Sequence, residues 1–143
     1  MGEFSTGLSS ELIDAYRKTH YQVFEDEPIT MIVGECHEGL LRLMGAYDCS
    51  CAAFMTAWNP FSQKTSPEQN LAQQEQLKSL IQSIELPFIE GEGRHPDGQW
   101  EGEPSLLVPG IEQTVADQIA RQFEQNAYLW IDNTGCPMLR LLR

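Results

Sequence analysis

The residues best suited to chemistry lie where a predicted strand stops. An apolar run ends at Trp58 and is followed at once by Asn59 and Pro60, with Ser62 two residues further on. Because proline cannot donate to a strand ladder, the strand is expected to stop here. A polar side chain at a strand end can bind a ligand, but Asn59 can also simply cap the turn.

A pair of glutamates offers a second possibility. Glu101 and Glu103 are two residues apart, so within a strand they would share one face. Paired carboxylates can perform acid–base or metal chemistry. The sequence supplies no third ligand and no partner nucleophile, so no catalytic residue is assigned and Glu103 is only a weak candidate for a general base.

The glycine-rich segment 90–103 contains Arg94, which could orient a polar substrate, next to His95. It lacks the G-x-x-x-x-G-K-[ST] pattern of a phosphate-binding loop, and its acidic residues would repel phosphate. Pro96, Asp97 and Gly98 predict a turn. The plain interpretation is a solvated hairpin tip.

The four cysteines do not have the spacing of a metal site. Cys36 and His37 are adjacent, and Cys49 and Cys51 are separated by one residue, whereas zinc knuckles use wider pairs. We therefore expect no metal and no cofactor. Residues 1–7 have neither the basic nor the apolar region of a signal peptide and are interpreted as a tag-like or disordered N-terminus. A cytoplasmic location and free thiols follow as expectations.

The net charge limits the possible partners. Nine Lys and Arg against 21 Asp and Glu give a formal charge of −12. Direct binding to nucleic acid or to anionic membranes is disfavoured, because neutralising phosphate requires basic side chains. No apolar run is long enough to span a bilayer. The charge favours solubility, and it leaves open a basic partner or mimicry of nucleic acid.

Hydrophobic spacing predicts one α+β domain over residues 8–143, with a mixed, mostly antiparallel sheet and helices packed on it. The order is α-β-α-β-α-β-β-α-β-β. The first predicted helix is capped by Ser9 or Ser10 and continues to Val23 and Phe24, and the second is His37–Met44. The third runs from Ser66 to about Leu86, with Ser66 as its cap, Pro67 at its first position, and an apolar face of Leu71, Leu77, Leu80, Ile81 and Ile84. The fourth bears Val115, Ile119, Ala120 and Phe123. The predicted strands are Ile29–Val33, Cys51–Trp58, Phe88–Ile89, Ser105–Val108, Tyr128–Ile131 and Met138–Leu142. The strand Cys51–Trp58 is nearly all apolar and is expected to be buried on both faces. Asn126 is expected to take the left-handed position after the last helix.

A set of motifs spread from about Tyr16 to Leu142 resembles the DUF3293 family of small bacterial proteins of unknown function. The motifs are Thr56-Ala57-Trp58-Asn59-Pro60-Phe61-Ser62, Asn70, Gly91-x-Gly93, Trp100-x-x-Glu103-x-Ser105-Leu106-Leu107-Val108, Ala116, Ala120, Phe123 and Gln125-Asn126-Ala127. The family usually reads Trp-x-Glu-x-Ser, so either Glu101 or Glu103 could hold its acidic position. The resemblance implies a pattern of polar residues at turns and names no reaction.

The candidate ligand-binding residues converge if strand 51–58 lies beside strand 103–108. They are Asn59, Ser62, Asn70, Arg94, Trp100, Glu103, Ser105 and Gln125. The leading interpretation is a non-catalytic binding or regulatory module for an unknown protein or small molecule. The alternatives are an enzyme acting on a small polar or nucleotide-like substrate, and an antitoxin or nucleic-acid mimic. A homodimer could form through an edge strand of the late hairpin 127–142.

Overall fold

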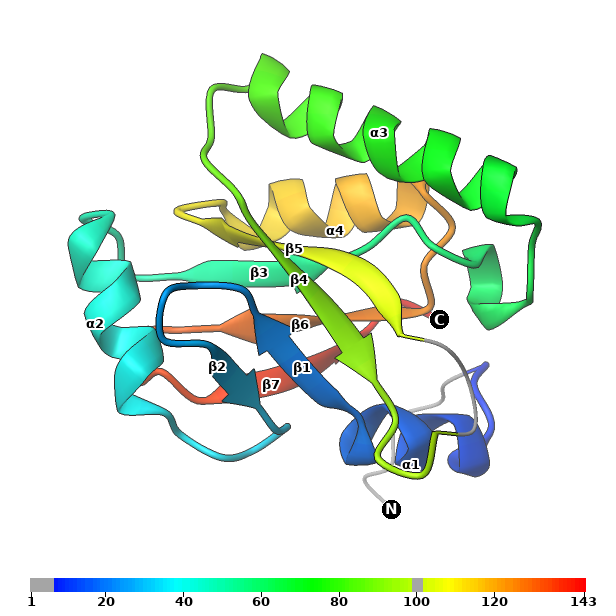
Figure 1. The fold of residues 1–143 in the computed structure, drawn as a ribbon, viewed down its shortest axis with the longest axis horizontal. Helices are drawn as coiled ribbons and strands as arrows, with labels where there is room; N and C mark the ends of the chain where they lie inside the picture. Colours follow the sequence, from blue (N-terminus) through cyan, green and yellow to red (C-terminus); the bar gives the residue numbers. More distant parts are fainter. Residues whose placement is uncertain (1–6, 99–101) are drawn as a thin grey trace.

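The computed structural model describes residues 7–98 and 102–143, in which seven strands form one sheet with helices on both faces (Figure 1). The helices are α1 (Ser10–Lys18), α2 (Glu38–Ala46), α3 (Pro67–Ser83) and α4 (Gln113–Gln122), with a 3-10 turn, η1 (Pro60–Ser62). The strands are β1 (His20–Val23), β2 (Ile29–Met31), β3 (Ala52–Met55), β4 (Ile89–Arg94), β5 (Glu103–Pro109), β6 (Ala127–Ile131) and β7 (Pro137–Leu141). Their order in the sheet is β2-β1-β4-β5-β3-β6-β7. The predicted α+β class is confirmed, and every strand pair in the described residues is antiparallel, where a mixed sheet was expected.

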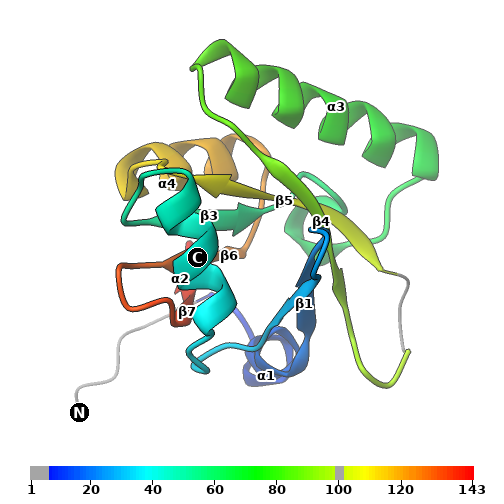
Figure 2. The same cartoon turned by 60° about the vertical axis from the view of Figure 1, so that its left-hand side comes forward.

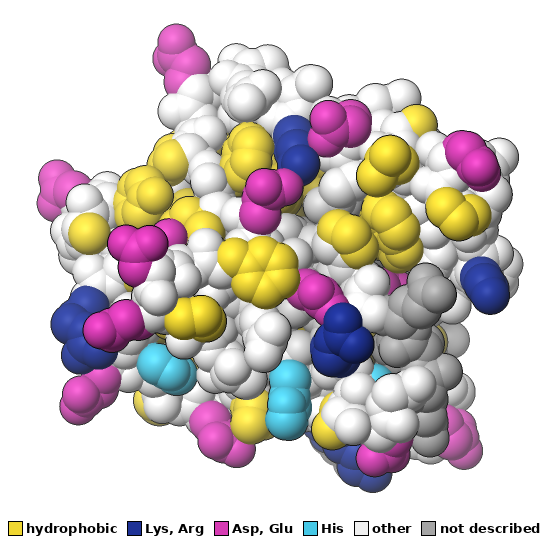
Figure 3. Space-filling view, in the orientation of Figure 1, with side chains coloured by type: hydrophobic (Ala, Val, Ile, Leu, Met, Phe, Trp, Pro, Cys, Tyr) yellow, Lys and Arg dark blue, Asp and Glu magenta, His cyan; other side chains and the backbone are white. Residues whose placement is uncertain are grey.

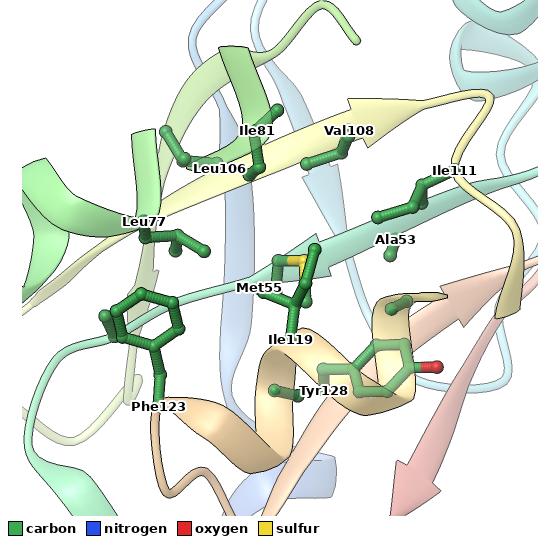
Figure 4. Packing of buried hydrophobic residues seen from close by; sticks show 13 residues of the cluster. Ala53, Met55, Leu77, Ile81, Leu106, Val108, Ile111, Ile119, Phe123 and Tyr128 are labelled. Atoms are coloured by element: carbon green, nitrogen blue, oxygen red, sulfur yellow. The ribbon is translucent and has the colours of Figure 1, made fainter. Parts of the chain in front are cut away.

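Two apolar clusters hold the helices to the sheet. On one face α3 and α4 pack over β3 and β5 through Leu77, Ile119 and Met55 (Figures 1 and 4). On the other face α2 packs over Phe54 and Leu107. Because successive residues of a strand point to opposite faces, β3 serves both clusters and all four of its residues are buried. The predicted burial of this strand on both faces is confirmed. In the parts of the chain that the structure describes, no helix is long and apolar enough to cross a membrane.

The predicted first helix is wrong beyond Lys18. Thr19 is extended, with φ −67° and ψ 141°, and residues 20–23 form β1, which pairs with both β2 and β4. Val23 is buried in the second cluster and Tyr21 packs against it. Apolar residues at 21 and 23 fit the two-residue period of a strand, and sheet pairing stabilises that conformation here.

The glycine-rich segment is also different from the prediction, because β4 continues through it to Arg94. Gly91 and Gly93 pair with Val23 and Tyr21 of β1. A Cβ atom added to Gly91 would lie 2.2 Å from the carbonyl oxygen of Gln22, so this glycine allows close approach between strands. The predicted turn is present: the N–H of Gly98 donates to the carbonyl of His95 at 3.0 Å, and Gly98 has a φ of 67°.

A disulfide joins Cys36 to Cys136, so the expectation of four free thiols is wrong. Two backbone hydrogen bonds bring the segments together: the N–H of Gly34 donates to Pro137 (2.8 Å) and the N–H of His37 to Gly135 (3.1 Å). The two cysteines are 100 positions apart, so the spacing of neighbouring residues in the sequence could not predict that they pair. Cys49 and Cys51 are free. Within residues 7–98 and 102–143, no three His, Cys, Asp or Glu side chains gather as a metal site would require.

Candidate functional site

A pocket of about 690 Å³ is lined by Phe54 and Leu129 of the second cluster, so it lies on the face of the sheet that carries α2. In Figure 2, α1 lies below the sheet on the opposite side from α3. The floor of the pocket comes from the strands, and its walls come from α1 and from the segment between β3 and α3. Its volume lies in the usual range for sites that bind small molecules.

Side chains along β4 and β5 point alternately to the two faces of the sheet, and this alternation determines which residues form the pocket floor. Glu103 and Ser105 point to the same face as Leu107, which belongs to the second cluster. Gly93 lies directly opposite Glu103 and has no side chain to fill the space beside it. The rings of Tyr21 and Phe54 meet edge to face, with their centroids 5.8 Å apart. The floor therefore combines aromatic surface with one carboxyl group.

A reciprocal amide pair builds one wall. The backbone N–H of Asn59 donates to Oδ1 of Asn70, and Nδ2 of Asn70 donates back to Oδ1 of Asn59, both at 2.8 Å. The N–H of Thr65 also donates to Oδ1 of Asn59, at 3.1 Å. Since a backbone N–H can only donate, this bond fixes which atom of the Asn59 amide is oxygen. The amide nitrogen must then face the pocket floor.

That nitrogen donates to Glu103. The distance from Nδ2 of Asn59 to Oε2 of Glu103 is 2.9 Å. Burial raises the pKa of the Glu103 carboxyl above its ordinary value, and the hydrogen bond from Asn59 offsets part of that rise. No Lys or Arg side chain of the described residues forms an ion pair with Glu103. Among the residues that the structure describes, the desolvated carboxyl group therefore has one neutral side-chain partner, and it has unused acceptor capacity.

Backbone strain is concentrated in the same wall. Asn59, Phe61 and Ser62 all have left-handed φ values, of 47°, 54° and 58°. The turn is held by the N–H of Phe61, which donates to the carbonyl of Glu124 at 2.6 Å, and by the guanidinium of Arg143, 4.4 Å from the centre of the Phe61 ring. Such conformations cost about 1–3 kcal/mol each and cluster at ligand sites, where the surroundings enforce them.

Two polar residues just before β6, Gln125 and Asn126, support this turn. Nε2 of Gln125 donates to the carbonyl of Trp58 at 3.2 Å, and Nδ2 of Asn126 donates to Oγ of Ser62 at 3.2 Å. The hydroxyls of Ser62 and Tyr16 share a further hydrogen bond of 2.5 Å. The predicted left-handed position for Asn126 is wrong: Glu124 occupies it, with φ 56°. Asn126 is buried between α1 and the turn, where its Nδ2 donates to the hydroxyl of Tyr16 as well as to that of Ser62.

Six of the eight candidate residues line this one pocket: Asn59, Ser62, Asn70, Glu103, Ser105 and Gln125. Arg94 does not line it and forms an ion pair with Glu92 at 2.5 Å. Trp100 and Glu101 lie outside the described residues. The predicted neighbourhood of the strands is confirmed, since Phe54 pairs with Leu107. Several lining residues were missed, namely Tyr16, Tyr21, Thr56, Lys64 and Thr65.

The inner face of α3 explains why Asn70 lies in the wall. The apolar spacing predicted an inner face that includes Leu71 and Ile84, but these side chains are 59% and 40% exposed. Asn70 and Gln74 are buried instead. Oε1 of Gln74 accepts the N–H of Ala57 at 2.9 Å. The backbone N–H groups that follow β3 need hydrogen-bond acceptors, and the polar side chains of α3 supply them. The polar side of α3 therefore faces the end of β3.

We expect Glu103→Gln to raise the free energy of unfolding by about 1 kcal/mol near neutral pH. The folded-state pKa of Glu103 is raised, so its contribution to stability is fully present below the ordinary value of 4.5 and is lost as pH rises through the folded pKa. Glutamine keeps the acceptor for Asn59 and carries no charge. The other titratable side chains in the lining, Tyr16, Tyr21, Lys64 and Tyr128, are unchanged.

Urea denaturation of both proteins from pH about 4 to about 8 measures this effect. The stability difference should be small at the acidic end and should grow with pH. A difference that is constant across the range would contradict the assignment of a desolvated carboxyl group.

Comparisons with known proteins give one match. Residues 55–128 match the family model described as "Protein of unknown function (DUF3293)". No curated protein and no solved structure matches the chain. The matched range includes the turn after β3, the amide pair, Glu103 and Gln125. It covers just over half of the 143 residues, and the chain therefore belongs to the DUF3293 family.

Proposed function

We propose that this protein binds a small organic molecule in the pocket beside Glu103, without covalent chemistry. The observation that carries the proposal is a cavity of about 690 Å³ whose aromatic floor contains a desolvated carboxyl group. Pockets that combine apolar surface with a few convergent polar groups are the usual form of a small-molecule site.

The hydrogen bonds of the wall favour binding over catalysis. Oγ of Ser105 donates to the carbonyl of Glu103 at 3.0 Å, and Ser62 is bonded to Tyr16 and Asn126. Within the described part of the chain, neither hydroxyl has a basic partner that could activate it as a nucleophile. Most polar atoms of the wall hold the turn in place, and Glu103 is the acidic group of the lining that remains for a ligand.

An enzyme is the second candidate, because a carboxyl group with a raised pKa in a pocket can act as a general acid or base. Mimicry of nucleic acid has less support. Figure 3 shows acidic side chains scattered over one face, with Lys and Arg side chains among them, and no continuous acidic surface. A regulatory role, a protein partner and a homodimer through β7 stay predictions.

The cytoplasmic location also stays a prediction, and the disulfide weighs against it. Disulfides persist in oxidising compartments and are rare in the cytosol. Fractionation of cells that express the native protein would decide the location.

A fragment screen by ligand-observed NMR tests small-molecule binding. In Gly93→Leu, the new side chain would extend from the pocket floor. Gly45→Leu is the matched control, because an added Cβ at this exposed position on α2 meets no atom within 4 Å. We expect fragments that bind the unaltered protein and Gly45→Leu, and that lose about tenfold or more in affinity with Gly93→Leu. Fragments that bind Gly93→Leu equally well, or a screen with no binders, would overturn the proposal.

A further inference from the structure

The chemistry of the pocket points to one class of ligand. We infer that it selects a small organic cation, in which an N–H-bearing ammonium, amidinium or guanidinium group lies against Glu103 and an aromatic or aliphatic body lies on the floor. This inference rests on the proposed function and adds the identity of the group that is recognised.

The first support is the arrangement of partners around Glu103. Its Oε2 accepts one hydrogen bond, from the neutral amide of Asn59, and no basic side chain of the described residues pairs with it. A desolvated carboxylate is costly without a counter-charge. A cation that donates an N–H to Glu103 would supply the counter-charge from the ligand.

The second support is the aromatic surface around the carboxyl group. Tyr21, Phe54, Tyr16 and Trp58 all line the pocket. The negative faces of aromatic rings attract organic cations, and this attraction strengthens when water is excluded. An anion would be repelled by the carboxyl group and by the negative faces of the rings. Among the described residues of the lining, the exposed Lys64 is the basic side chain that could attract it.

The third support is the charge of the whole molecule. A formal net charge of −12 creates a field that draws cations to the protein and repels anions. Burial also raises the pKa of Glu103, so a bound cation should displace a proton from this group in mildly acidic solution.

Three probes of similar shape test the inference: benzamidine (a cation), benzamide (neutral) and benzoate (an anion). Titration calorimetry should show that benzamidine binds about tenfold more tightly than benzamide, because hydrogen bonds to charged groups are the stronger kind. Benzoate should bind most weakly. At pH about 5, benzamidine binding should release protons, seen as a dependence of the heat on the buffer's ionisation enthalpy.

Two variants separate selectivity from folding. Glu103→Gln keeps the acceptor for Asn59 and should abolish both the preference for benzamidine and the proton release. Glu25→Gln makes the same change at an exposed glutamate outside the pocket lining, and should leave the preference in place. Thermal unfolding of each variant shows whether it is folded.

The outcomes distinguish the two proposals. If benzamide binds as tightly as benzamidine and Gly93→Leu removes both, the small-molecule pocket stands and the cation selectivity is overturned. A benzamidine preference that survives in folded Glu103→Gln, or tight binding of benzoate, also overturns it. If no probe binds while the fragment screen yields other ligands, the cation is the wrong class. If the fragment screen yields no binder and none of the three probes binds, the proposed function is rejected as well.

Discussion

Replacing Cys136 with serine is expected to lower the free energy of unfolding by about 3–4 kcal/mol in oxidising buffer. The disulfide closes a loop between residues that are 100 positions apart. Closing so long a loop restricts the unfolded chain strongly, which accounts for the size of the effect. The variant should also lose the anchor at the start of α2, since His37 caps that helix next to Cys36.

Urea denaturation with and without a reducing agent measures this prediction. The reducing agent should lower the stability of the unaltered protein to that of Cys136→Ser and should leave the variant unchanged. Cys49→Ser is the matched control, because Cys49 is a free thiol, and it should retain the full dependence on the reducing agent. If the unaltered protein is equally stable under both conditions, the cross-link contributes nothing.

Gly91→Ala is expected to destabilise the protein by about 3 kcal/mol, the upper part of the usual range for overpacking. The added Cβ would lie 2.2 Å from the backbone oxygen of Gln22 and 2.9 Å from the Phe54 ring. A backbone atom cannot rotate away as the end of a side chain can, so β1 and β4 must separate at the Val23 end of their pairing.

Gly93→Ala is the comparison, since it makes the same change two residues along the same strand. Its Cβ would lie 3.5 Å from the Tyr21 ring and 3.6 Å from Thr19, which is ordinary contact. We expect a change below about 1 kcal/mol, because alanine fits the space and glycine is a poor strand residue. Equal losses of stability in the two variants would show that close approach of the strands at Gly91 is not the cause.

The sequence was informative where a local rule applied. The Ser66 cap, which accepts the N–H of Gln69, and the following proline predicted the start of α3 correctly. The buried character of β3 followed from its apolar run. The turn at Gly98 followed from its composition. In each case the cause lies within a few residues along the chain.

The errors occurred where distant segments decide the structure. β1 exists because β2 and β4 pair with it, and the disulfide exists because two loops meet. The candidate site was found through the resemblance, which grouped polar turn residues before their contacts were known. Tyr16 was missed because an amphipathic helix gives no sign that one of its hydroxyls reaches Ser62.

The reciprocal bonds between Asn59 and Asn70 have a consequence for how this family can change over time. Each amide satisfies a group of the other residue, so a substitution at either position leaves a buried partner without its hydrogen bond. The two positions should therefore covary among family members: both asparagines are retained together or both are replaced together. Chains that have replaced the pair would also have lost the donor that orients residue 103, so their pockets should have diverged in what they recognise.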